Sequence, residues 1–137
     1  MALPGGIGPF QRAIPDVELW LRGKTVTVHE SVDVEQLNKI RYGCTHLWPI
    51  EDVSIETDVA VSTAALSTSL LDKLGRHVRV GGVILALDEY TIDMSRGRFE
   101  ALVAPSALEI VRYSLPHRLP FLSRRRRPVS CILRRRN

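Results

Sequence analysis

The sequence predicts an α/β domain whose mostly parallel sheet is flanked by helices. Two strand-like segments, 58–61 and 83–87, enclose a stretch that carries leucines at helical spacing, namely Leu66, Leu70, Leu71 and Leu74. Residues 83–87 form an unbroken aliphatic run, which is typical of a strand buried on both faces of a sheet. A strand, a helix and a strand in this order form a βαβ unit, which implies parallel strands and a ligand crevice at their carboxyl edge.

The segments before this unit add two helices and two strands. Residues 10–21 predict a helix, although Pro15 suits only a first turn, and Gly23 ends it. The β-branched run 25–29 predicts a strand. Ser31 or Asp33 would cap a short helix that ends near residue 40. Residues 44–49 give a weak strand signal, and residues 51–57 predict a polar loop.

The segments after this unit predict an antiparallel ending. Gly81-Gly82 is expected to break the chain before the aliphatic strand. The polar connection 88–97 is too short for a further helix. Residues 99–103 and 108–113 then predict a C-terminal antiparallel hairpin, separated by Ala104-Pro105-Ser106.

Composition supports one globular domain. The chain has 137 residues, of which 45% are hydrophobic and 25% charged, and both fractions are ordinary for a globular protein. No apolar run approaches the ~20 residues of a membrane helix. The N-terminus lacks the pattern of a signal peptide, and Cys44 and Cys131 show no pairing pattern. We therefore expect an intracellular protein, cytoplasmic or nuclear, with reduced thiols.

The positive charge is concentrated at the C-terminal end. The net charge is +4, from 19 basic and 15 acidic residues, but residues 124–137 contain seven arginines and no acid. The rest of the chain therefore has 12 basic against 15 acidic residues, a net of −3. We expect one domain over residues 1–120 and a disordered arginine-rich tail over 121–137. Such a tail attracts nucleic acid or another polyanion through Arg124, Arg125, Arg126, Arg127, Arg134, Arg135 and Arg136.

Three motifs resemble those of class I S-adenosylmethionine (SAM)-dependent methyltransferases, which have a Rossmann-like sheet. Residues 4–10, PGGIGPF, are similar to the glycine-rich turn of that family. Residues 26–31, VTVHES, are similar to its second strand, which ends in an acid. Residues 58–62 and 74–85 are similar to its fourth strand and to the turn into its fifth strand, with Val80 in place of the usual proline.

The resemblance implies a cofactor site. Gly5, Gly6 and Gly8 would let the backbone approach SAM closely. Glu30, which lies 22 positions after Gly8, would accept the hydroxyl hydrogens of the ribose. By position, Glu51 or Asp52 and Ser62 or Thr63 would complete the nucleoside pocket, and we select Asp52 and Ser62. The implied reaction is methyl transfer by in-line displacement at the sulfonium carbon, and no catalytic residue is identified.

The chain departs from the family at its start. Only Met1-Ala2-Leu3 precede the glycines, whereas the family has an apolar strand there that ends in an acid. We therefore expect a truncated or degenerate member, with catalysis incomplete. The four histidines lack metal-ligand spacing, so no metal site is expected.

The alternative is a non-enzymatic nucleic-acid-binding or interaction protein, viral or accessory, that acts through its arginine tail. Its strands would be mostly antiparallel. Parallel strands at 25–29, 58–61 and 83–87 would instead favour the methyltransferase-like domain.

Overall fold

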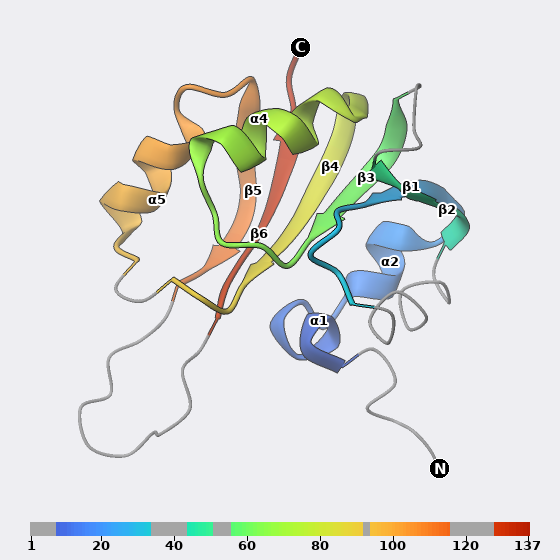
Figure 1. Cartoon of the computed structure of the whole chain (residues 1–137), viewed down its shortest axis with the longest axis horizontal. Helices are drawn as coiled ribbons and strands as arrows, with labels where there is room; N and C mark the ends of the chain where they lie inside the picture. The colour runs from blue at the N-terminus through green and yellow to red at the C-terminus, as the bar shows by residue number, and fades with distance from the viewer. Residues whose placement is uncertain (1–7, 34–43, 51–55, 92–93, 116–127) are drawn as a thin grey trace.

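The computed structural model describes residues 8–33, 44–50, 56–91, 94–115 and 128–137 (Figure 1). The elements in chain order are α1 (Gly8–Ala13), α2 (Val17–Leu21), β1 (Lys24–Val28), β2 (Cys44–Pro49), β3 (Thr57–Ser62), α4 (Thr68–Arg76), β4 (Val78–Asp88), α5 (Arg96–Val103), β5 (Leu108–Ser114) and β6 (Val129–Arg135). No helix in these ranges is long and apolar enough to cross a bilayer. The short helix predicted to end near residue 40 lies mostly outside them.

Six strands form one sheet in the order β2-β1-β3-β4-β6-β5. The first four run parallel, and β6 is antiparallel to both β4 and β5. This confirms the mostly parallel α/β sheet and the parallel direction of 25–29, 58–61 and 83–87. It also argues against the antiparallel domain of the alternative. The sheet is continuous at its centre because β1 pairs directly with β3, with Val26 opposite Val59.

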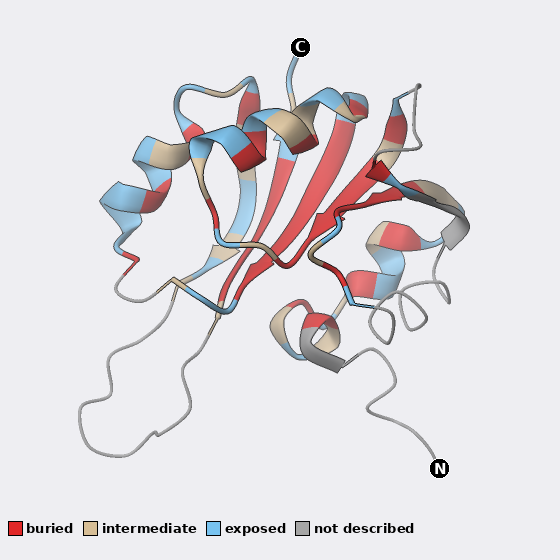
Figure 2. Ribbon diagram, viewed as in Figure 1, coloured by how far each residue is buried: buried red, intermediate tan, exposed pale blue. Residues whose placement is uncertain are grey.

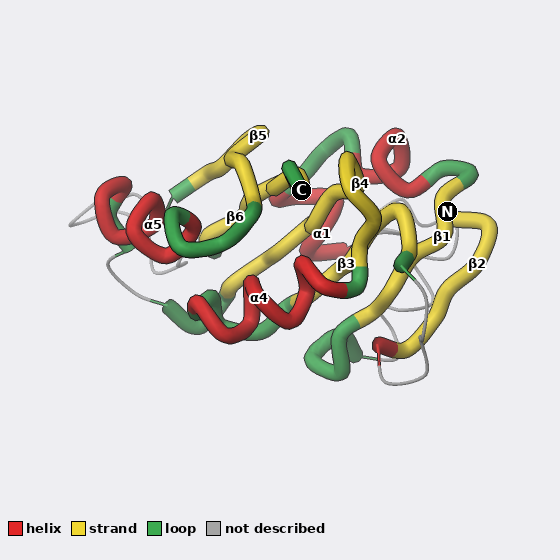
Figure 3. The backbone as a smooth tube through the Cα atoms, turned by 90° about the horizontal axis from the view of Figure 1, so that it is seen from above, coloured by secondary structure: helices red, strands yellow, loops and turns green. Residues whose placement is uncertain are grey.

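Helices cover both faces of the sheet, as Figure 3 shows from above. On one face, α4 and α5 pack on small and aliphatic side chains of the sheet, including Ala60, Ile84 and Ala86. On the other face, α1 and α2 pack on Val59, Leu85 and other strand residues that alternate with those of the first face. Both side-chain sets of β3 and β4 are therefore buried, which explains their unbroken apolar runs (Figure 2).

Helix α4 confirms the leucine pattern. Ser67 caps it, since its hydroxyl accepts a hydrogen bond from the Leu70 N–H at 3.1 Å. Leu70, Leu71 and Leu74 are buried against the sheet. The helix predicted over 10–21 is instead divided into α1 and α2, because Pro15 between them cannot continue a helix.

The predicted hairpin has a different first strand. Residues 99–103 belong to α5, which Ser95 caps by accepting from the Arg98 N–H at 3.1 Å. Phe99 and Val103, four positions apart, are buried on one side of this helix. The prediction of a strand here and of no helix after residue 88 was therefore wrong. The antiparallel partner of β5 is β6.

The arginine-rich end is not a disordered tail in its last ten residues. Val129–Arg135 form β6, which lies between β4 and β5. Its first five side chains, of sequence VSCIL, are buried. The prediction failed because the apolar run is short and the arginine clusters on both sides of it are typical of a solvated tail.

Gly81-Gly82 also behaves differently from the prediction. The pair lies inside β4 and does not break it. Thr57 pairs with Val78 and Val59 pairs with Val83. An advance of two residues along β3 therefore corresponds to an advance of five residues along β4. Residues 79–82 therefore bulge out of the ladder, and Gly81 at φ +84° permits the turn.

Candidate ligand site at the carboxyl edge of the sheet

The direction of chain progression reverses between β1 and β3. From β1 the chain continues to β2 on one side, and from β3 it continues to β4 on the other side. The carboxyl ends of two adjacent parallel strands with diverging connections form a topological switch point, where open α/β sheets bind ligands. The residues that follow β1, β3 and β4 therefore define the candidate site.

Hydrogen bonds join the segments that follow β1 and β3. The Ser31 hydroxyl accepts from the Thr63 N–H at 2.9 Å, and the Thr63 hydroxyl donates to the Ser31 carbonyl at 2.6 Å. Two residues earlier in each segment, the His29 N–H donates to the Val61 carbonyl at 2.9 Å. These bonds fix the two strand ends relative to each other, so the floor of the candidate site is preorganised.

The His29 side chain also contacts Ser31. Its Nδ1 accepts from the Ser31 N–H at 3.1 Å and lies 2.8 Å from the Ser31 Oγ. Because the backbone N–H of Ser31 donates to Nδ1, this ring nitrogen acts as an acceptor. The Ser31 hydroxyl then donates to His29 while it accepts from Thr63.

Ser62, one of the predicted cofactor residues, is fully buried. Its hydroxyl accepts from the Ala64 N–H at 3.1 Å and lies 3.4 Å from the Ser31 Oγ. Ser62 is therefore buried next to Ser31 and is not exposed at the surface of the candidate site.

Glu30, the predicted ribose ligand, follows β1 at the carboxyl edge and is exposed. Its neighbours His29 and Ser31 are held by the contacts described above, so its backbone position is fixed. Gly8 begins α1. Gly5, Gly6 and Asp52 lie outside the described residues, and their roles stay predictions.

Asp88, at the end of β4, is a functional candidate that the sequence reasoning missed. Its carboxylate is fully buried and accepts from the backbone N–H groups of Leu66, Tyr90 and Thr91 at 2.9, 2.8 and 2.9 Å, and also from the Thr91 hydroxyl. Burial would raise the pKa of Asp88, but these hydrogen bonds outweigh it and hold the pKa below its ordinary value. The sequence did contain a signal for this candidate, because Asp88 is an acid directly after the apolar run 83–87.

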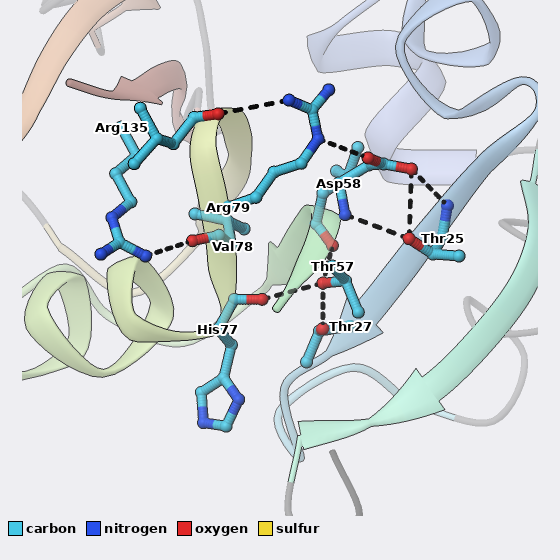
Figure 4. Close-up of polar contacts among 10 residues, drawn as sticks. Thr25, Thr27, Thr57, Asp58, His77, Val78, Arg79 and Arg135 are labelled. Atoms are coloured by element: carbon cyan, nitrogen blue, oxygen red, sulfur yellow. Dashed lines mark hydrogen bonds and ion pairs between the residues drawn. The ribbon is translucent and has the colours of Figure 1, made fainter. Parts of the chain in front are cut away.

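A second polar cluster lies at the opposite, amino edge of the same strands (Figure 4). The Arg79 Nε donates to Asp58 Oδ1 at 2.7 Å. Asp58 Oδ2 accepts from the N–H of Thr25 at 3.0 Å and from its hydroxyl at 3.1 Å. The hydrogen bond from Arg79 lowers the pKa of Asp58, burial opposes it, and the bonds from Thr25 add to the lowering. The cluster joins β1, β3 and the bulge of β4.

The arginines of β6 and its end lie among acids. Arg134 and Arg136 form ion pairs with Glu109 at 3.6 and 3.8 Å. Arg135 pairs with Glu56 at 2.7 Å and donates to the Val78 carbonyl at 2.5 Å. These three arginines therefore link β6 to β5 and to the amino edge. The other predicted nucleic-acid-binding residues, Arg124–Arg127, lie outside the described residues.

Comparisons with known proteins found no family model and no curated protein that match this sequence. Similar folds are present among solved structures. One is the 1,6-didemethyltoxoflavin-N1-methyltransferase of Burkholderia thailandensis, crystallised with 1,6-didemethyltoxoflavin and S-adenosylhomocysteine. It is 9% identical, with a TM-score of 0.66 over 96% of this chain and 80% of that chain.

Two further structures agree. The N-methyltransferase NodS of Bradyrhizobium japonicum WM9 is 12% identical, with a TM-score of 0.57 over 95% of this chain and 98% of that chain. The magnesium protoporphyrin IX methyltransferase of Synechocystis PCC 6803, with SAM bound, is 8% identical, with a TM-score of 0.56 over 93% and 80%. Identities this low establish the fold alone. The sheet order, the helices on both faces and these likenesses together show that this chain has the class I SAM-dependent methyltransferase fold.

Proposed function

We propose that this chain is a methyltransferase-like domain that binds SAM at the carboxyl edge of β1, β3 and β4. The observation that carries the proposal is the reversal of chain progression between β1 and β3, with the exposed carboxylate of Glu30 at that point. The fold neighbours from Burkholderia and Synechocystis were solved with S-adenosylhomocysteine and with SAM, which supports the choice of ligand.

The described residues fit a nucleoside at this edge. A carboxylate presents two oxygens, which suit the two adjacent hydroxyl groups of a ribose. Glu30 is exposed just after the end of β1, so it is accessible to a ligand at this edge. The contacts between Ser31 and Thr63 make the floor rigid before ligand arrives, which lowers the entropic cost of binding.

The remaining predicted residues complete the proposal. Gly5, Gly6 and Gly8 let the backbone up to the start of α1 approach the cofactor, and Asp52 contacts the adenine. Bound SAM supplies an electrophilic methyl group on its sulfonium. The contribution of the protein to such a transfer is mainly positioning, which is why few catalytic side chains are expected.

Isothermal titration with S-adenosylhomocysteine tests the proposal. The wild-type protein should bind, and Glu30→Gln should weaken binding by roughly ten- to a hundredfold, because a hydrogen bond to a charged group contributes about 1.5–3 kcal/mol. Glu18→Gln is the matched control. Glu18 is an exposed acid of α2 that pairs only weakly with Arg22, at 3.9 Å. Absence of heat at millimolar ligand, or equal affinities of the two variants, would contradict the proposal.

A further inference from the structure

Tyr90 is an exposed aromatic side chain at the same edge as the candidate site. It lies two residues after the end of β4 and is 70% exposed. The other large apolar side chains that are exposed in the described residues lie elsewhere: Leu19 is on α2, Val80 is in the bulge at the amino edge, and Val111 is within β5. Among the residues whose burial the structure describes, Tyr90 is therefore the large exposed apolar side chain at the carboxyl ends of the parallel strands.

The backbone that carries Tyr90 is fixed from inside the protein. The buried Asp88 carboxylate accepts from the N–H groups of Tyr90 and Thr91, and from that of Leu66 in the segment before α4. Burying a carboxylate is costly unless hydrogen bonds compensate for the lost water. Here the Tyr90 and Thr91 donors come from the turn itself and the Leu66 donor comes from the segment that follows β3, so the carboxylate ties the two together. The ring of Tyr90 is thus presented to solvent from a rigid support.

Tyr90 and Glu30 lie at the two ends of the candidate site. They follow β4 and β1, and these two strands flank β3. Neighbouring strands lie about 4.8 Å apart, so the two residues leave the sheet about 10 Å from each other. Such a separation leaves room at Tyr90 for a second ligand beside a nucleoside that is anchored at Glu30.

We propose that Tyr90 is the contact for the methyl acceptor and that the acceptor is a small molecule with a flat aromatic or heteroaromatic ring. This inference rests on the proposed function, because it assigns the second ligand of the same site. A tyrosine ring offers a large flat surface with only two side-chain torsions to restrict, so stacking on it has a low entropic cost. Stacking of a flat ring on an aromatic side chain changes affinity by roughly five- to a hundredfold.

Direct titration of a small aromatic probe tests this assignment. The probe is indole, titrated into protein saturated with S-adenosylhomocysteine and followed by saturation-transfer NMR, with cyclohexanol as a non-aromatic comparison. Wild type and Tyr90→Phe should bind indole alike, and both should prefer it to cyclohexanol. Tyr90→Ala should bind indole at least fivefold more weakly. Leu19→Ala, which removes another exposed apolar side chain, should not differ from wild type.

The outcomes separate the two proposals. Affinity for S-adenosylhomocysteine should be the same in all four proteins, since Tyr90 is not assigned to the cofactor. If the cofactor product binds but Tyr90→Ala retains the indole affinity of wild type, the assignment of Tyr90 is wrong and the proposed function stands. If wild type does not bind S-adenosylhomocysteine, both are overturned.

Discussion

Gly82 gives the most direct test of how the structure is held together. A Cβ added at Gly82 would lie 2.8 Å from the Asp58 carbonyl oxygen and 2.9 Å from the Arg79 carbonyl oxygen. Both are backbone atoms of the paired strands β3 and β4, so no side chain can move aside. The bulge that brings Arg79 to Asp58 (Figure 4) therefore needs glycine at position 82.

We expect Gly82→Ala to lower the free energy of unfolding by about 1–3 kcal/mol, the usual cost of inserting one carbon into a packed site. For a domain of this size the melting temperature should fall by about 4–10 °C. The matched control is Gly97→Ala in α5, where an added Cβ meets nothing within 4 Å. Alanine is the better helix former, so this variant should gain about 0.5–1 kcal/mol.

Urea denaturation followed by circular dichroism measures both changes, and an unchanged m-value would assign them to the native state. Opposite signs are expected for the two variants. A Gly82→Ala protein within about 0.5 kcal/mol of wild type would refute the reasoning, because it would mean that the strands are not as close as the register requires.

Three further predictions follow from the two edges and from β6. Because the native pKa of Asp58 is lowered, the stability that its carboxylate contributes is present above the unfolded pKa near 4 and is lost as the pH falls through the native pKa. The difference in unfolding free energy between wild type and Asp58→Asn should therefore be large at pH 7 and shrink below about pH 4. Denaturation at several pH values measures this difference. Burial raises the pKa of the Cys131 thiol to about 12, so in a Cys44→Ser background a thiol reagent should react only after denaturant unfolds the protein; fast labelling of native protein would contradict the buried strand. Deleting residues 129–137 removes β6 and should abolish cooperative unfolding, whereas replacing Arg124–Arg127 by glutamine should keep the fold and lower salt-dependent retention on RNA; unchanged retention would exclude these arginines as a nucleic-acid surface.

The βαβ unit was predictable because its signals are local. Leu70, Leu71 and Leu74 repeat at the helical period, and residues 83–87 are apolar at every position. The sheet then buries both sides of these strands, which is the environment that such runs indicate. Parallel direction followed from the connecting helix, because a strand that returns through a helix lies parallel to the first.

The end of the chain was not predictable from local pattern. VSCIL, residues 129–133, is apolar but short, and the arginines on both sides are typical of a solvated tail. Its burial depends on pairing with β4 and β5, whose residues are distant in sequence. Residues 99–103 were misassigned for a related reason. Phe99 and Val103, four positions apart, lie on one side of a helix, and this side is buried only because it packs on a face of the sheet, which the local sequence does not reveal.

The candidate site divides in the same way. The sequence alone identified the strands that precede Glu30 and Ser62, because a β-branched run (25–29) and an apolar run (58–61) stop just before these polar residues. Only the tertiary structure showed that the hydroxyls of Ser31 and Thr63 join these two ends and that Asp88 holds the turn of Tyr90. Period and composition report which residues are buried, whereas hydrogen bonds between loops depend on strand order and register, which are set by contacts between distant segments.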